Sequence, residues 1–175
     1  PRRWSGLSDG EVMIRVEREG ECCTVWLARS DKANALTEGM LTGIGSAVAE
    51  AADCGAKVLI LTGEGKVFSA GADLEEMKAG LGLSAAWEAA SGAIAAFPGL
   101  SIAALNGTLA GGAMGVALAC DLRIAVPNAQ FFYPVMRLGY RPQPSDPGRL
   151  AALVGPARAR MILLAGQKIG ADEAL

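Results

Sequence analysis

The chain has 175 residues, of which 51% are hydrophobic, 19% are charged and 23 are glycine, and its formal net charge is -2. This length and composition predict one folded domain with a sizeable core and argue against an intrinsically disordered chain. The nearly balanced charge, without runs of one sign, gives no basis for binding nucleic acid or an anionic membrane.

Histidine is absent, and this removes whole classes of chemistry. Ser-His-Asp and Cys-His systems need an imidazole base, and the usual zinc sites need imidazoles or closely spaced thiolates. The four cysteines, Cys22, Cys23, Cys54 and Cys120, show no CxxC spacing. We therefore expect no metal site, and reduced thiols as in a cytoplasmic protein.

Hydrophobic periodicity predicts strands and helices in alternation. A hairpin of 13–18 with 24–28 turns around Gly20, and Thr37 is the expected N-cap of a helix that reaches about Asp53. Further strands are expected at 58–61, 101–105, 122–126 and 130–133. Further helices are expected from Asp73 onward and at 84–97, 111–119, 147–154 and 156–165. This order predicts an α/β fold with a largely parallel core sheet, formed by residues 1–175 as one domain.

Residues 89–120 carry no charged side chain, so a membrane span has to be considered. Three turn signals, Pro98-Gly99, Asn106-Gly107 and Gly111-Gly112, divide this run into pieces shorter than the roughly 20 residues that a membrane helix needs. We expect buried elements of a soluble core instead. The chain opens on Pro1 without an apolar signal segment, which agrees with the expected cytoplasmic location.

Two segments combine small residues with the start of a predicted helix. They are Ala70-Gly71-Ala72 and Gly111-Gly112. Small residues let a ligand approach the main chain, and a helix N-terminus presents N–H groups without helical partners. If neighbouring strands bring the two segments together, their amides would form an oxyanion hole. Taken singly, each glycine run is better explained by close helix–sheet packing.

The stretches that contain these segments resemble a known family. KVFSAGADLEEM (66–77), followed by SIAALNGTLAGGAMGVALACDLRIA (101–125), is similar to the signature pair of the crotonase superfamily (enoyl-CoA hydratase/isomerase). RSDKANAL (29–36) and GQKIGADEAL (166–175) resemble two further family segments, in the family's order. The resemblance implies the crotonase (ClpP-like) fold, which consists of stacked ββα units.

The resemblance also implies a substrate and a site. The substrate would be an acyl-CoA thioester, with coenzyme A carried as part of it and no separate cofactor. The backbone amides of Ala72 and Gly112 would be the oxyanion-hole donors. The residues that the motifs assign to coenzyme A binding are Lys32, Ala33, Ala70, Gly71, Ala72, Asp73, Leu74, Gly111 and Gly112. Asp73 is more simply explained as the cap of its helix.

Three positions depart from the family's pattern. Hydratases carry glutamates at the positions that hold Gly115 and Val135 here, and relatives with an aspartate in the next loop carry it at the position of Gln143. Each such acid or base contributes typically about 100- to 10,000-fold in rate, so hydration is disfavoured. Isomerisation, decarboxylation and thioester hydrolysis with another base stay open. The alternative is a non-catalytic acyl-CoA-binding or assembly subunit. A peptidase-like relative of the fold would lack its histidine base.

Several polar residues lie near enough in the sequence to replace the missing acids, although a structural or solvent-exposed interpretation is favoured for each. They are Glu75, Glu76, Glu88, Tyr133, Arg137, Tyr140, Arg141 and Asp146. Glu75 and Glu76 are interpreted as first-turn acids that face water. Asp146, which precedes Pro147, is interpreted as an N-cap with proline at the first helical position.

Family members usually continue beyond the segment that ends this chain. Their helical tail packs over the acyl pocket and builds a trimer. Because the chain stops at Leu175, we expect either a domain cut from a longer protein or a protein without this lid. For the whole protein the resemblance implies a homotrimer or a hexamer.

Overall fold

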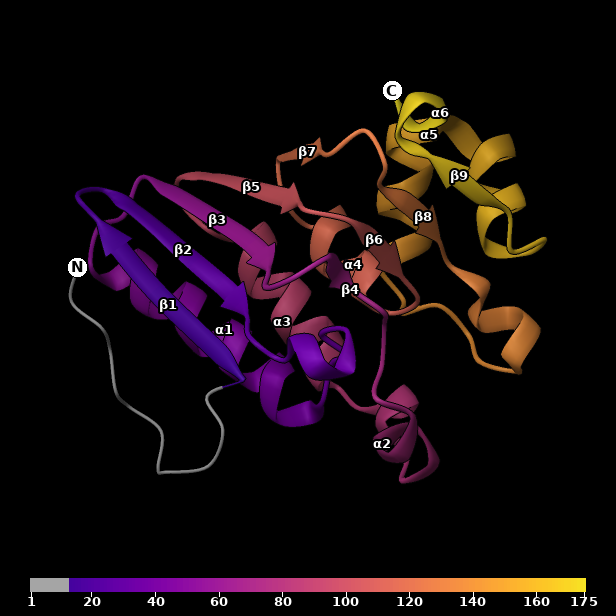
Figure 1. Cartoon of the computed structure of the whole chain (residues 1–175), viewed down its shortest axis with the longest axis horizontal. Helices are drawn as coiled ribbons and strands as arrows, with labels where there is room; N and C mark the ends of the chain where they lie inside the picture. Colours follow the sequence, from indigo (N-terminus) through magenta and orange to yellow (C-terminus); the bar gives the residue numbers. More distant parts are fainter. Residues whose placement is uncertain (1–12) are drawn as a thin grey trace.

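The computed structural model describes residues 13–175, which form two β-sheets with helices around them (Figure 1). The larger sheet contains, in spatial order, β1 (Ile14–Glu19), β2 (Cys22–Leu27), β3 (Val58–Gly63), β5 (Leu100–Leu105) and β7 (Leu122–Ala125). β1 and β2 pair antiparallel, and the remaining pairs in this sheet are parallel. The expected α/β fold with a largely parallel core sheet is therefore confirmed.

A second sheet was not expected from the sequence. It contains β4 (Val67–Ser69), β6 (Thr108–Ala110), β8 (Gln130–Phe132) and β9 (Lys168–Gly170), and only the β8–β9 pair is antiparallel. β8 is the strand predicted at 130–133, whereas β4, β6 and β9 were not predicted, because three residues are too few for an alternating pattern to stand out from a loop. The chain passes from the larger sheet to the smaller one three times, as β3–β4, β5–β6 and β7–β8.

Five of the described helices begin close to their predicted positions, and the short α6 (Ala171–Ala174) was not predicted. The five are α1 (Glu38–Asp53), α2 (Leu74–Lys78), α3 (Ala86–Ala95), α4 (Ala113–Leu118) and α5 (Asp146–Leu163), with short 3-10 turns η1 (Ser30–Lys32), η2 (Leu81–Leu83) and η3 (Pro134–Leu138). The Thr37 side chain accepts a hydrogen bond from the Met40 N–H and so caps α1, as predicted. α5 joins the two predicted helices across a break at Gly155, whose φ is 77°.

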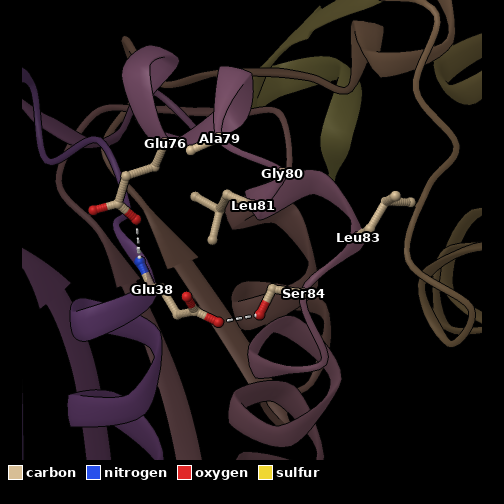
Figure 2. A pocket seen from close by; sticks show the side chains of 7 residues that line it. All are labelled: Glu38, Glu76, Ala79, Gly80, Leu81, Leu83 and Ser84. Atoms are coloured by element: carbon tan, nitrogen blue, oxygen red, sulfur yellow. Dashed lines mark hydrogen bonds between the residues drawn. The ribbon is translucent and has the colours of Figure 1, made fainter.

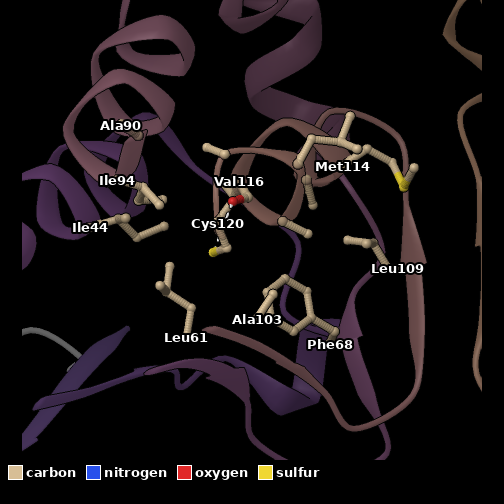
Figure 3. Packing of buried hydrophobic residues seen from close by; sticks show 14 of the residues in the cluster. Ile44, Leu61, Phe68, Ala90, Ile94, Ala103, Leu109, Met114, Val116 and Cys120 are labelled. Atoms are coloured by element: carbon tan, nitrogen blue, oxygen red, sulfur yellow. Dashed lines mark hydrogen bonds between the residues drawn. The ribbon is translucent and has the colours of Figure 1, made fainter. Parts of the chain in front are cut away.

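The hydrophobic core joins the two sheets to the helices, as Figure 3 shows. Ile44 of α1 and Ile94 of α3 lie on one side, and Leu61 of β3, Phe68 of β4 and Val116 of α4 lie around them. All five side chains are buried. α4 is buried along its whole length, so the uncharged run of residues 89–120 is largely core. Among the described residues no helix is both long and apolar enough to cross a membrane.

The arrangement places the two glycine segments together. β4 and β6 are parallel neighbours in the smaller sheet, and each is followed directly by one of the segments and then by a helix. Parallel neighbours end at the same edge of a sheet, so the starts of α2 and α4 face a common region. In Figure 1, α2 stands away from the sheets, whereas α4 lies behind β6.

Candidate active site

The two glycine segments lie close together. A Cβ atom placed on Gly71 would lie 3.1 Å from the carbonyl oxygen of Ala110 and 3.4 Å from Cα of Gly111. Gly71 has a φ of 103° and Gly111 a φ of 56°, values that favour glycine. The backbone conformation thus favours glycine at both positions, and the close approach favours it further at Gly71.

The backbone N–H of Ala72 points away from the extended segment around Leu36, which lies beside it. Ala72 forms an isolated parallel bridge with Leu36. The Leu36 N–H donates to the Gly71 carbonyl over 2.7 Å, and the Asp73 N–H donates to the Leu36 carbonyl over 2.8 Å. In a parallel ladder the residue between these two bonds directs its own N–H to the opposite side. Within residues 13–175 this amide donates to no backbone or side-chain acceptor.

The amide of Gly112 is also unengaged. Gly112 is the N-cap residue of α4, so its N–H has no acceptor inside the helix. Its neighbour Gly111 donates to the Phe132 carbonyl over 3.0 Å, which fixes the turn to β8. In the part of the chain that the structure describes, no acceptor is paired with the Gly112 N–H. Two unpaired amides therefore flank the close approach of Gly71 to Gly111.

The segment assigned to coenzyme A lies beside the first glycine segment. The Ala70 N–H donates to the Ala33 carbonyl over 2.9 Å, and Ala33 has a left-handed φ of 50°. Lys32 and Ala70 are exposed, and Leu74 is 74% exposed. These residues form an open edge next to the paired segments, as an extended ligand would need.

Asp73 is the cap of α2, as predicted. Its Oδ1 accepts hydrogen bonds from the N–H groups of Glu75 and Glu76, at 3.0 and 3.2 Å. Its Oδ2 accepts from the Arg29 guanidinium over 2.7 Å. The hydrogen bond from Arg29, followed by those from the helix start, lowers the pKa of Asp73. The carboxylate stays ionised and is committed to holding the segment in place.

The three positions that depart from the family's pattern have different surroundings. Val135 lies in η3 and packs against the core. The Gln143 side chain donates to the Gly82 carbonyl over 3.3 Å. Gly115 is buried in α4, and a Cβ atom there would lie 2.7 Å from Oδ1 and 3.0 Å from Oδ2 of Asp146. The space that a side chain at position 115 would need is thus occupied by a carboxylate from α5.

Asp146 is a buried acid, and its interpretation as an N-cap is wrong. Ser145 holds the N-cap position of α5, and Asp146 is the first helical residue, so its side chain is free to point inward. The side chain is fully buried, and its Oδ2 accepts a hydrogen bond from the Tyr133 hydroxyl over 2.5 Å. Its Oδ1 has no hydrogen-bond partner within residues 13–175. Burial raises the pKa of Asp146 to about 6, with the Glu88 carboxylate acting in the same direction.

The remaining acidic candidates have structural partners. The exposed Glu75 forms an ion pair with Lys78 over 2.8 Å. Glu76 lies in the first turn of α2, as predicted, and is half-buried because it accepts the Glu38 N–H at the start of α1 over 2.6 Å. Glu88 accepts the Ser145 hydroxyl over 2.9 Å, and thereby holds the start of α5.

The candidates in the loop after the second sheet divide into one buried and three exposed residues. Tyr133 is 1% exposed, and burial raises its pKa, followed by the charge of Asp146. Arg137 and Arg141 are exposed, and Arg137 lies against Gly166. Tyr140 is 38% exposed and lies against Gly82.

A surface hollow of about 430 Å³ lies between α1, α2 and η2, and neither glycine segment is among its lining residues (Figure 2). Its two carboxylates are engaged. Glu76 accepts the Glu38 N–H, and the Glu38 side chain accepts the Ser84 hydroxyl over 2.5 Å. Because these acids stabilise helix starts, the hollow lacks a free acid, base or nucleophile among its lining residues.

Comparison with known proteins identifies the family. Residues 17–175 match the sequence model of the enoyl-CoA hydratase/isomerase family. The chain belongs to the enoyl-CoA hydratase/isomerase family. Relatives in this family include the probable enoyl-CoA hydratase echA6 of Mycobacterium bovis, 32% identical over 93% of this chain and 67% of its own. The crotonyl-CoA hydratase of Syntrophomonas wolfei is 38% identical over 92% of this chain and 65% of its own.

Solved structures of the family have the same fold. The Pseudomonas aeruginosa structure of DspI has a TM-score of 0.87 and 29% identity, over 98% of this chain and 73% of its own. An enoyl-CoA hydratase subunit from Geobacillus kaustophilus has a TM-score of 0.84 and 35% identity, over 93% of this chain and 65% of its own. The crotonase fold is therefore confirmed. The chain spans about two thirds of the length of the sequence relatives named above.

Sequence reasoning named Asp146 and Tyr133 as separate candidates but missed that they form a pair with Gly115. A signal for the pair was present. A glycine in the middle of a predicted buried helix leaves a space that another side chain has to fill. The partner that fills it comes from 31 positions later in the sequence, so local pattern gave no means of identifying it.

Proposed function

We propose that this chain acts on an acyl-CoA thioester and that the amides of Ala72 and Gly112 hold the thioester oxygen. The observation that carries the proposal is the close approach of Gly71 to Gly111, with an unpaired amide beside each glycine. Amides fixed in this way stabilise negative charge that develops on an oxygen, and cost no reorganisation during the reaction. The family's hydratases, named for CoA thioesters, support the substrate class.

The exposed edge formed by Lys32, Ala33 and Ala70 supports binding of the coenzyme A portion, largely through backbone groups. Coenzyme A then arrives as part of the substrate, and the proposal needs no separate cofactor. For the whole protein we propose a homotrimer or hexamer. Exposed apolar side chains on β7 and α5, Leu122, Ile124, Leu153, Met161 and Leu164, are in keeping with such association.

The proposed chemistry is enolate formation, because the positions of both hydratase glutamates hold Gly115 and Val135. Isomerisation and decarboxylation pass through an enolate and hydrolysis through a tetrahedral oxyanion, and the same two amides would stabilise the negative oxygen in each case. The competing function is a non-catalytic acyl-CoA-binding or assembly subunit, which would keep the paired segments and turn nothing over. The same loss of glutamates favours that alternative.

Turnover of a panel of acyl- and enoyl-CoA thioesters, followed by mass spectrometry, separates the two functions. Ala72→Pro removes one proposed donor, and loss of one such donor typically costs about 100- to 1,000-fold in rate. Ala72→Gly keeps the N–H and measures the cost of changing the side chain alone. Gly112 is unsuitable for this test, because a Cβ atom there would lie 2.8 Å from the Trp87 ring. Tight binding of thioesters without turnover would support the binder.

A further inference from the structure

The carboxylate of Asp146, a residue of α5, lies against α4 at Gly115. It fills the space above Gly115, with its oxygens 2.7 and 3.0 Å from where a Cβ atom would be. Residues three apart on a helix are neighbours on one face, so position 115 lies about one turn from the proposed donor Gly112. A carboxylate in this space therefore lies beside the proposed thioester site.

One oxygen of this carboxylate is held and the other is unpaired. The Tyr133 hydroxyl donates to Oδ2 over 2.5 Å, and both side chains are almost completely buried. Oδ1, the oxygen nearest to position 115, has no partner in residues 13–175. Buried polar atoms are paired in the great majority of native structures, so an unpaired carboxylate oxygen requires an explanation.

The charges around Asp146 favour a group that exchanges protons near neutral pH. Glu88 of α3 opposes its ionisation, Arg149 of α5 favours it, and the Tyr133 hydrogen bond favours it as well. α4 packs against the carboxylate at Gly115 and contains no titratable side chain. Burial has the largest effect, and the resulting pKa of about 6 suits a general base that must also return its proton.

We propose that Asp146 is the proton-transfer residue of the thioester site and that Tyr133 is its positioning residue, an inference that rests on the acyl-CoA function proposed above. The Asp146 carboxylate removes a proton from the carbon next to the thioester carbonyl. The electron pair of that C–H bond becomes the enolate, whose oxygen is held by the amides of Ala72 and Gly112. Asp146 then returns the proton to the same carbon or, in a β,γ-unsaturated acyl group, to the γ-carbon. No oxidant, reductant or water is consumed.

The test follows proton exchange directly. The protein is incubated in D₂O with β,γ-unsaturated acyl-CoA thioesters of several chain lengths. Deuterium uptake is measured by mass spectrometry, and double-bond migration by the absorbance of the conjugated thioester. We expect the wild-type protein to catalyse exchange, and Asp146→Asn to lower its rate by about 100- to 10,000-fold, the usual range for one acid/base group. Thioester affinity, measured by calorimetry, should change by far less.

Two further variants separate catalysis from folding. Glu75→Gln, which removes an exposed carboxylate paired with Lys78, is the matched control and should keep the wild-type rate. Tyr133→Phe should retain part of the rate and move the midpoint of its pH dependence upward, because the lost hydrogen bond favours the ionised form of Asp146. A purely structural role for Tyr133 would lower the rate without moving that midpoint.

The outcomes distinguish this inference from the function on which it rests. If Asp146→Asn exchanges protons at the wild-type rate while Ala72→Pro does not, Asp146 is not the base and the oxyanion function stands. If the wild-type protein binds thioesters and shows neither deuterium exchange nor double-bond migration, the Asp146 inference falls and the binder remains. If it binds no thioester, both proposals fall. Should Asp146→Asn fail to fold, a wild-type exchange rate that does not change around a pH of about 6 would overturn the inference.

Discussion

Gly115 and Asp146 occupy complementary spaces: a Cβ atom on Gly115 would lie 2.7 Å from Oδ1 of Asp146. This separation is shorter than real Cβ contacts allow, so a side chain at position 115 and the present carboxylate exclude each other. The family resemblance places a glutamate at position 115, and this packing leaves no room for one beside the Asp146 carboxylate.

Gly115→Ala should destabilise the protein by about 1–3 kcal/mol, the usual cost of overpacking a buried site. The cost should largely disappear in an Asp146→Gly background, because the obstructing carboxylate is then gone. Urea unfolding of the wild type, both single variants and the double variant measures this coupling. Gly45→Ala in α1 is the control, since nothing lies within 4 Å of its Cβ position, and it should stabilise the protein by roughly 1 kcal/mol. If the changes in unfolding free energy of the two single variants simply add up in the double variant, the two positions do not compete for the same space.

The burial of Asp146 should make stability fall with rising pH. Its pKa is about 6 in the folded chain, against an ordinary value of 3.8 for an aspartate. Between these values the native state binds more protons than the unfolded state, so the free energy of unfolding decreases as pH rises through this window. At about 1.36 kcal/mol for each pH unit, the decrease is roughly 3 kcal/mol, and Asp146→Asn should lack it.

The quantity to compare is the difference in free energy of unfolding between the wild type and Asp146→Asn, measured at each pH. Asp73 and Asp121 have lowered pKa values, caused first by hydrogen bonds with Arg29 and Ser101, and their contributions to stability are lost as pH falls. These opposing contributions cancel in the difference. A difference that stays constant from about pH 4 to about pH 7 would mean that Asp146 titrates as an ordinary exposed acid.

Much of the fold was predictable because it depends on local pattern. Thr37 and Asp73 cap their helices as expected, and the buried strands and helices lie within a few residues of their predicted positions. Strands β4, β6 and β9 were not predicted, since three residues carry too little periodicity. They become strands only because neighbours in space complete their hydrogen bonds.

The candidate site was predictable where motifs carry it and not where it depends on distant contacts. The glycine segments were recognisable from residue type, and the structure brings Gly71 and Gly111 together. Asp146 before Pro147 has the local sequence of a helix cap, and that interpretation is wrong because Ser145 takes the N-cap position. The inward direction of its side chain depends on Tyr133 and Gly115, which no local pattern connects to it.

Gly71→Ala and Gly80→Ala should both lower the stability of the protein, but Gly71→Ala should lower its activity much more. The two glycines have similar φ values, 103° and 108°, so both variants bear the cost of a left-handed conformation. At Gly80 nothing lies within 4 Å of the added Cβ, whereas at Gly71 it would lie 3.1 Å from the Ala110 carbonyl oxygen. Only Gly71→Ala should therefore push the two amide segments apart. Thermal unfolding and thioester turnover of both variants give the comparison, and equal losses of activity would contradict it.

The infrared stretching frequency of a ¹³C-labelled thioester carbonyl tests the central claim most directly. An acyl-CoA bound to the wild-type protein should absorb at lower frequency than in water, because two fixed amides polarise the carbonyl more strongly than mobile water does. Ala72→Pro should remove a large part of this shift, and Ala72→Gly should retain it. A carbonyl frequency that is the same in water, in the wild-type protein and in Ala72→Pro would show that these amides do not hold the thioester oxygen.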